Sequence, residues 1–170
     1  MESLGQVMEI LDAESSLKGW IDCVTSATQS IRVGFYTADL ESVFVGLIEA
    51  RGRGVAVTVL GDAATTRRNK NTTSQLQLLA SRGARVGLTQ GRLLTERYAR
   101  ASPGSWIEGK RGIFHGKVLI ADRRMILGSC NYTTSSLCNV EWGVMLELSD
   151  KGLEDATSRF DQELQLAEAL

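Results

Sequence analysis

The stretch Val55-Ala-Val-Thr-Val-Leu60 decides the fold, because it is short, apolar and rich in β-branched residues. Such a run is typical of a strand that is covered on both faces of a sheet. An earlier segment, Ile31-Arg-Val-Gly-Phe-Tyr36, predicts a second strand, and Val43, Leu47 and Ile48 lie between the two at helical spacing. This strand–helix–strand order predicts an α/β fold with a mixed, mostly parallel sheet and helices on both faces.

The same periodicities predict the other elements. We expect helices through 17–28, from a cap at Asp39 to about 52, over 73–81, within 131–138 and over 151–170, and strands over 85–88, 113–121, 125–128 and 142–148. The basic stretch 62–71 predicts a loop. Residues 90–112, which are rich in Gly, predict a long loop with one helical turn over 93–97, and loops of this length are often functional. No repeat is visible, so residues 1–170 are expected to form a single domain.

Charge is unevenly divided along the 170 residues, although the net charge is only −1. Residues 51–124 hold 15 Lys or Arg against 4 Asp or Glu, whereas the segments 1–50 and 125–170 each hold 2 against 8. Positive charge gathered on one face steers anionic partners, and scattered surface arginines that serve solubility are the alternative. The charge pattern alone leaves both explanations open.

No stretch approaches the roughly 18 apolar residues of a membrane span, and the first 16 residues lack the features of a secretion signal. The three cysteines, Cys23, Cys130 and Cys138, form no CxxC pair and are expected to be reduced thiols in the core. We therefore expect a cytoplasmic location, with association to an organelle left open.

The only histidine, His115, lies in Phe114-His-Gly-Lys-Val-Leu-Ile-Ala-Asp122. On a strand His115 and Lys117 share one face, and Gly116 between them leaves room for a ligand at the backbone. A single histidine is more often structural, so its surroundings decide. Ser129 and Asn131 follow with the same spacing in Gly128-Ser-Cys-Asn-Tyr-Thr-Thr134. Imidazole, ammonium, hydroxyl and carboxamide together suit a tetrahedral anion.

His-x-Lys-x4-Asp followed by Gly-Ser-x-Asn resembles the HKD signature of the phospholipase D superfamily, and the elements over residues 17–60 resemble the start of its single-motif members. The resemblance implies a phospholipase D-like fold and hydrolysis of a phosphodiester without metal or other cofactor. His115 would attack phosphorus and form a phosphohistidine. Lys117 and Asn131, with Ser129 behind them, would hold the non-bridging oxygens.

Three further positions match the family pattern. Glu141 matches an acidic residue that fixes the imidazole tautomer, with a solvated glutamate at a strand end as the alternative. Asp122 and Gly128 match structural positions of the motif. Five residues separate Asp122 from Gly128, one fewer than is usual in the family, which predicts a tightened hairpin.

The implied mechanism needs two histidines, so we expect a homodimer with one composite site. Nucleic acid is the expected substrate, because cations surround the motif in the sequence, and Tyr98 and Trp106 could stack on bases. The residues expected to bind substrate are Arg67, Arg68, Lys70, Lys110 and Arg111. A phospholipid hydrolase, entered through 93–94 and 106–107, and a non-catalytic nucleic-acid-binding dimer are the alternatives.

Overall fold

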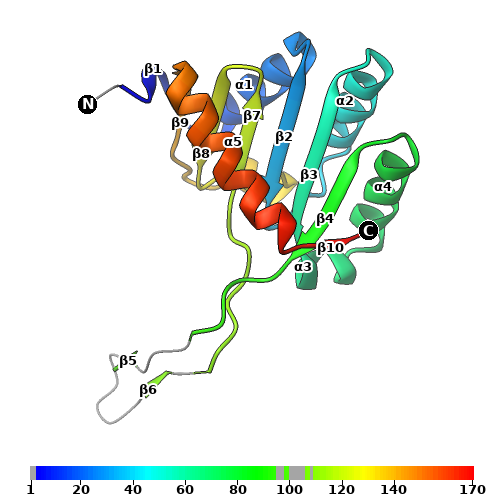
Figure 1. The fold of residues 1–170 in the computed structure, drawn as a ribbon, viewed down its shortest axis with the longest axis vertical. Coiled ribbons are helices and arrows are strands. Elements are labelled where there is room, and N and C mark those ends of the chain that lie inside the picture. The colour runs from blue at the N-terminus through cyan, green and yellow to red at the C-terminus, as the bar shows by residue number, and fades with distance from the viewer. Residues whose placement is uncertain (1–2, 95–97, 100–105, 108) are drawn as a thin grey trace.

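A computed structural model describes residues 3–94, 98–99, 106–107 and 109–170, and these form a mixed sheet between helical layers (Figure 1). The helices are α1 (Ala13–Ser26), α2 (Glu41–Gly52), α3 (Ala63–Arg68), α4 (Lys70–Ser81), the 3-10 helix η1 (Thr134–Cys138) and α5 (Asp150–Gln165). The strands are β1 (Gly5–Leu11), β2 (Ser30–Phe35), β3 (Ala56–Asp62), β4 (Arg85–Thr89), β5 (Tyr98–Ala99), β6 (Trp106–Ile107), β7 (Val118–Ala121), β8 (Arg124–Gly128), β9 (Gly143–Leu148) and β10 (Glu168–Ala169).

Eight strands lie in the order β1-β9-β8-β7-β2-β3-β4-β10. The expected α/β fold with a mixed sheet between helices is confirmed, but the expectation of a mostly parallel sheet is wrong. Only β2–β3 and β3–β4 are parallel, and the other five neighbouring pairs within the described residues are antiparallel. Parallel neighbours need a crossover that runs the length of the sheet. By contrast, β7 joins β8 through a two-residue turn, and β8 joins β9 through a segment with η1 that starts and ends at the paired residues Gly128 and Gly143.

The helices cover the two faces of the sheet unequally. α1, α2 and α4 lie on one face, where Trp20, Phe44 and Leu47 belong to the larger hydrophobic core. α5 crosses the other face diagonally (Figure 1), and Phe160 of this helix packs in a smaller core with Leu60 and Ile120. The α5 side of the sheet therefore has the thinner cover.

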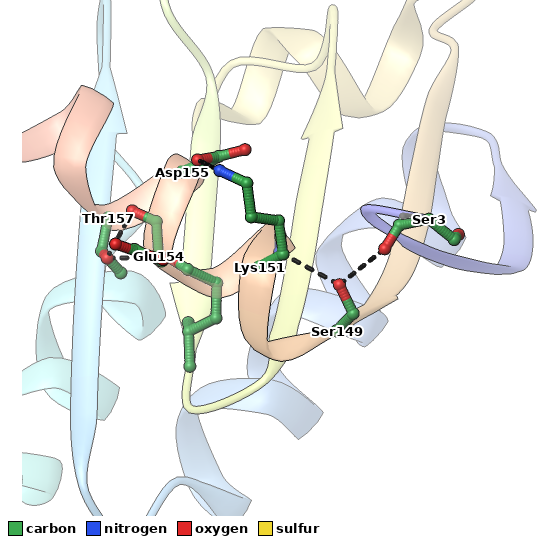
Figure 2. A network of polar contacts seen from close by, with 8 residues as sticks. Ser3, Ser149, Lys151, Glu154, Asp155 and Thr157 are labelled. Carbon is green, nitrogen blue, oxygen red and sulfur yellow. Dashed lines mark hydrogen bonds and ion pairs between the residues drawn. The ribbon is translucent and has the colours of Figure 1, made fainter. Parts of the chain in front are cut away.

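The edge strand β1 is missing from the expected elements. Its side chains are mostly exposed and Glu9 interrupts its apolar residues, so neither a buried run nor a clean alternation marks it. Pairing with β9 forms the strand. Ser3, two residues before β1, is joined to the start of α5, because the hydroxyl of the N-cap Ser149 donates to the Ser3 carbonyl at 2.7 Å (Figure 2).

Helix starts differ from the expected ones for reasons of capping. The stretch 62–71 is not one loop, because Asp62 caps α3 and Asn69 caps α4 from residue 70. Asp39 does not cap α2. Its carboxylate accepts instead from the backbone N–H of Thr134 at 3.0 Å, and Leu40 occupies the cap without a side-chain bond.

Boundaries also shift in the second half of the chain. Residues 113–117 belong to no strand, so β7 begins only at Val118, and β9 begins at Gly143. The short helix spans 134–138 only, and α5 ends at Gln165 before β10 pairs with β4. The expected tight hairpin is confirmed, because Ala121 pairs with Arg124 across a two-residue turn.

The long loop is a two-stranded arm rather than irregular chain. Leu93 pairs with Arg111, the N–H of Leu94 donates to the Lys110 carbonyl at 2.9 Å, and β5 pairs with β6 farther out. The helical turn expected over 93–97 is wrong at Leu93 and Leu94, and its remaining residues lie outside the described ones. The side chains of Tyr98 and Trp106, expected to stack on bases, also lie outside the described part.

Two further expectations concern cysteines and membranes. Cys23 is buried, but Cys130 is half-buried and Cys138 is exposed, so the expectation that all three lie in the core is wrong. Among the described helices, none combines the length and the hydrophobicity that a membrane crossing requires.

Candidate active site

The candidate site forms at the sheet edge where β2 and β3 end and β7 begins. Parallel strands present their carboxyl ends at one edge, and the antiparallel β7 starts there, since Val118 pairs with Gly34. β8 returns to the same edge, because Leu127 pairs with Val118. The His115–Lys117 and Ser129–Asn131 segments therefore flank two adjacent strand ends, as the sequence patterns predict.

The segment 113–117, which precedes β7, is held in place by the packing of the Phe114 ring and by the Asp62 carboxylate. The N–H of Phe114 donates to Asp62 Oδ2 at 3.0 Å. A Cβ at Gly116 would lie 2.8 Å from the Phe114 ring, and a Cβ at Gly34 would lie 3.1 Å from it. Glycine at these positions therefore makes room for Phe114. The expectation that Gly116 leaves space for a ligand is wrong, because the Phe114 ring fills that space.

His115 is exposed, whereas Lys117 is buried with 7% of its surface accessible. The Lys117 ammonium donates to the His115 carbonyl at 3.0 Å. The ring of Tyr36, at the end of β2, packs against the imidazole at 4.9 Å between centroids and lies 5.3 Å from Lys117 Nζ. Tyr36 therefore contacts both motif residues, and it is absent from the residues that the sequence patterns single out.

Electrostatics at this edge centre on Lys117. Burial lowers the pKa of its ammonium, and the negative charge of Glu141 opposes that shift. Glu141 is therefore near enough to interact with the buried cation. A positive charge fixed next to an exposed imidazole suits the binding of an anion.

Ser129 and Glu141 contact each other where β8 ends and β9 begins. The Ser129 hydroxyl donates to Glu141 Oε2, and Asn139 Nδ2 donates to Glu141 Oε1 at 3.1 Å. The N–H of Trp142 donates to the Ser129 hydroxyl oxygen at 3.1 Å. Within the described part of one chain, no hydrogen bond joins Glu141 to His115, so both carboxylate oxygens serve Ser129 and Asn139 here.

Asn131 and Lys117 line the same small cavity of about 20 Å³. The Asn131 Oδ1 atom is buried and has no hydrogen-bond partner among the described residues. At Gly128 the strands approach so closely that a Cβ would lie 2.7 Å from the Trp142 carbonyl oxygen. Any larger residue there would push Ser129 and Asn131 away from β9.

Asp122 lies at the opposite edge of the sheet, in the β7–β8 turn, with φ of 50°. Its carboxylate accepts from the N–H groups of Thr28, Gln29 and Ser30 at 2.9, 3.0 and 2.9 Å, and from the Thr28 hydroxyl at 3.1 Å. Burial opposes ionisation, but these hydrogen bonds together outweigh it and hold the pKa of Asp122 below its ordinary value. Asp122 joins the turn to the start of β2, which is a structural contact.

The basic segment of the sequence is divided between the two edges. α3 and the base of the arm lie at the same end of the sheet as the site (Figure 1), and they carry Arg67, Arg68, Lys110 and Arg111, with Lys70 opening α4. All five side chains are exposed, and Arg67 is paired with Glu168. Arg123 and Arg124 lie at the opposite edge beside Asp122. The sequence count therefore overstates the charge around the site.

Exposed apolar side chains and an apolar cavity border the site. Val140 and Trp142 are 91% and 70% exposed, and Ile113 is 49% exposed. A cavity of about 420 Å³ next to His115 is lined mainly by apolar side chains from 113–127 and α5, with Arg92 and Arg159 among the polar ones. Within the described residues, no three His, Cys, Asp or Glu side chains are grouped to hold a metal ion.

A mixed α/β sheet with His-x-Lys and Ser-x-Asn segments at two adjacent strand ends defines a phospholipase D-like domain. The family model described as "Cardiolipin synthase, PLD-like domain" matches residues 20–166. The chain therefore belongs to this phospholipase D-like family of phosphodiesterases. No curated protein sequence is significantly similar to it.

Solved structures support the same fold. NucT from Helicobacter pylori is 20% identical with a TM-score of 0.77, and the alignment covers 95% of this chain and 98% of NucT. Nuc from Salmonella typhimurium, a phospholipase D family member, is 19% identical with a TM-score of 0.74, and the alignment covers 95% of this chain and 97% of Nuc. TrmBL2, an archaeal chromatin protein with a novel mode of DNA binding, is 15% identical with a TM-score of 0.65. The alignment covers 100% of this chain and 57% of TrmBL2.

Proposed function

We propose that the protein is a metal-independent phosphodiesterase, an endonuclease that cleaves DNA or RNA at a site shared by two copies of the chain. One observation carries the proposal: the exposed imidazole of His115 and the buried ammonium of Lys117 share a sheet edge with Ser129, Asn131 and Glu141. A nucleophile, a fixed positive charge and neutral donors together suit phosphoryl transfer.

The proposed chemistry has two displacements at phosphorus. In the first, an imidazole nitrogen of His115 forms a P–N bond, the P–O bond to the leaving alcohol breaks, and a general acid gives that oxygen a proton. In the second, water attacks phosphorus, loses a proton to the same group, and breaks the P–N bond. The products are one phosphomonoester and one alcohol. The general acid and base is a second histidine.

A second copy of the chain is the source of that histidine, because the sequence contains only one. The apolar side chains of Val140 and Trp142 are exposed next to the Ser129–Glu141 pair. Large apolar groups left in water mark a contact surface. Packing of a partner over this surface would bring a second His115 to the site, which is why we propose a homodimer with one composite site.

Nucleic acid is the substrate that the charges favour. Arg68, Lys70, Lys110 and Arg111 are exposed around the edge that carries His115, and none forms an ion pair with a described residue. Unpaired cations near a phosphodiester site suit a polyanionic backbone read without regard to sequence. The DNA-binding protein TrmBL2 has a similar fold, which is consistent with this choice.

A cleavage assay in EDTA tests the proposal. Labelled single- and double-stranded DNA, RNA, and vesicles of phosphatidylcholine and cardiolipin are incubated with the wild type and with His115→Ala. We expect cleavage of nucleic acid that survives EDTA, is absent in the variant, and leaves a phosphohistidine after acid-free quenching of the wild type. Activity that EDTA abolishes, or that His115→Ala retains, would contradict the proposal.

A phospholipid hydrolase is the second candidate, and the apolar cavity of about 420 Å³ favours it. This cavity lies next to His115 and could hold part of an acyl chain. Cleavage of the vesicles alone, with nucleic acid left intact, would select this candidate. Binding of nucleic acid without any cleavage would select a non-catalytic dimer instead.

A further inference from the structure

Asp62, the last residue of β3, is a carboxylate with 1% of its surface accessible, and it makes hydrogen bonds with both oxygens. Oδ1 accepts from the N–H groups of Ala64 and Thr65 at 3.1 and 2.9 Å and from the Thr65 hydroxyl at 3.1 Å, which caps α3. Oδ2 accepts from the N–H of Phe114 at 3.0 Å. One side chain therefore joins a helix start to the residue that precedes His115.

The bond to Phe114 matters because residues 113–117 belong to no strand. In a sheet each backbone N–H is held by a neighbouring strand, but this segment lies ahead of β7 and lacks that support. The carboxylate of Asp62 takes the place of a strand neighbour at Phe114. The ring of Phe114 then packs against Gly34 of β2 and against Gly116 of the same segment.

His115 depends on this support because its own side chain has few contacts. In the described part of the chain the imidazole makes no hydrogen bond, and its packing partner is the Tyr36 ring at 4.9 Å. The direction of the imidazole is therefore set mainly by the backbone at 114–116. Displacement of a reacting group by about 1 Å can reduce a rate roughly 100-fold.

We propose that Asp62 is a positioning residue for His115: through the N–H of Phe114 it holds the unpaired segment so that the imidazole faces the scissile phosphate. This inference rests on the proposed function in so far as it concerns turnover. The effect of Asp62 on the orientation of the His115 imidazole does not depend on whether the protein is active. Asp62 is buried, and within the described residues its carboxylate bonds only to residues 64, 65 and 114, so it acts through the backbone of the motif.

The variant Asp62→Asn separates the two tasks of this side chain. Asparagine is as good an N-cap as aspartate, so its oxygen can still cap α3. Its NH₂ group would face the N–H of Phe114, and two donors cannot bond to each other. We expect the single-turnover rate on an oligonucleotide to fall by about 100-fold, while the KM changes less than about twofold.

Asn69→Ala is the matched control. Asn69 caps α4 by accepting from the N–H groups of Asn71 and Thr72 at 3.1 Å, and among the described residues no hydrogen bond joins it to 113–117. We expect this variant to lose thermal stability and to keep the wild-type single-turnover rate at saturating oligonucleotide, where weaker binding by the adjacent Arg68 and Lys70 has no effect on the rate. A folded Asp62→Asn protein with a rate within about twofold of the wild type would overturn the inference, as would an effect confined to KM.

A spectroscopic readout separates failure of this inference from failure of the proposed function. The chain has one histidine, so its imidazole gives a single set of carbon–proton NMR signals. We expect Asp62→Asn to shift or broaden these signals and Asn69→Ala to leave them in place, whether or not the wild type cleaves any substrate. Unchanged imidazole signals in Asp62→Asn would refute the positioning role even in an inactive protein.

Discussion

Removal of the Asp122 carboxylate should destabilise the fold by an amount that the structure allows us to estimate. Asp122 accepts four hydrogen bonds from residues 28–30, at 2.9 to 3.1 Å. A hydrogen bond contributes about 1 kcal/mol net, and the four share one carboxylate, so Asp122→Ala should lose about 3 kcal/mol. The φ of 50° adds roughly 1 kcal/mol, because alanine disfavours this left-handed conformation.

Asp122→Asn should have a smaller effect. Asparagine adopts the left-handed conformation readily and keeps one acceptor oxygen, so the loss should be about 1 to 2 kcal/mol. Chemical denaturation of the wild type and both variants at neutral pH measures these differences. Turnover at a temperature well below the melting point should stay close to that of the wild type, since Asp122 lies at the edge opposite His115.

The pH dependence follows from the direction of the pKa shift. The folded-state pKa of Asp122 lies below its ordinary value, so the charged carboxylate stabilises the fold at pH values above its unfolded pKa of about 3.9. This stabilisation is lost as the pH falls through the folded pKa. The difference between wild type and Asp122→Asn should thus be constant above about pH 5 and shrink below about pH 4. A difference in stability that does not vary with pH, or full loss of turnover without loss of stability, would exclude this structural role of the Asp122 carboxylate.

Two other predictions concern the surfaces around the site. Replacement of Arg68 and Lys70 by alanine should lower the salt dependence of single-strand binding by about 1.4 in the slope of log K against log salt, because each phosphate contact contributes about 0.7. Alanine at Arg82 and Arg85, two exposed cations where α4 ends and β4 begins, is the control and should leave the slope unchanged. Trp142→Asp should dissociate the proposed dimer in sedimentation experiments and abolish turnover. Leu166→Asp, at a side chain that is 73% exposed, is the control and should do neither. A Trp142→Asp protein that remains a fully active dimer would contradict the proposed interface.

The sequence predicts the central strands because their signals are local. β2 and β3 are short apolar runs, and the HKD-like motif has a fixed spacing. β1 has no such signal, since the pairing with β9 and not its own pattern forms the strand. The balance of parallel and antiparallel pairs depends on how the chain returns after residue 113. A residue-by-residue pattern does not contain that information.

The same limit applies to the site. His115, Lys117, Ser129 and Asn131 could be identified because each pair lies within three residues of chain. Asp62 could not, because its contact with Phe114 joins residues 52 positions apart. Asp62 before Ala-Ala-Thr-Thr is a helix-cap signal, but the basic residues that follow, Arg67, Arg68 and Lys70, favour a loop. Tyr36 likewise reaches His115 only through the antiparallel pairing of β2 with β7, which joins distant parts of the chain.

In the proposed dimer, one active site requires His115 from two copies of the chain. A heterodimer with one wild-type subunit and one His115→Ala subunit, purified through two different affinity tags, tests it most directly. A composite site predicts turnover below about 1% of the wild-type dimer, because a histidine is missing from the only site. Two independent sites would leave about half of the activity, and that result would rule out a composite site.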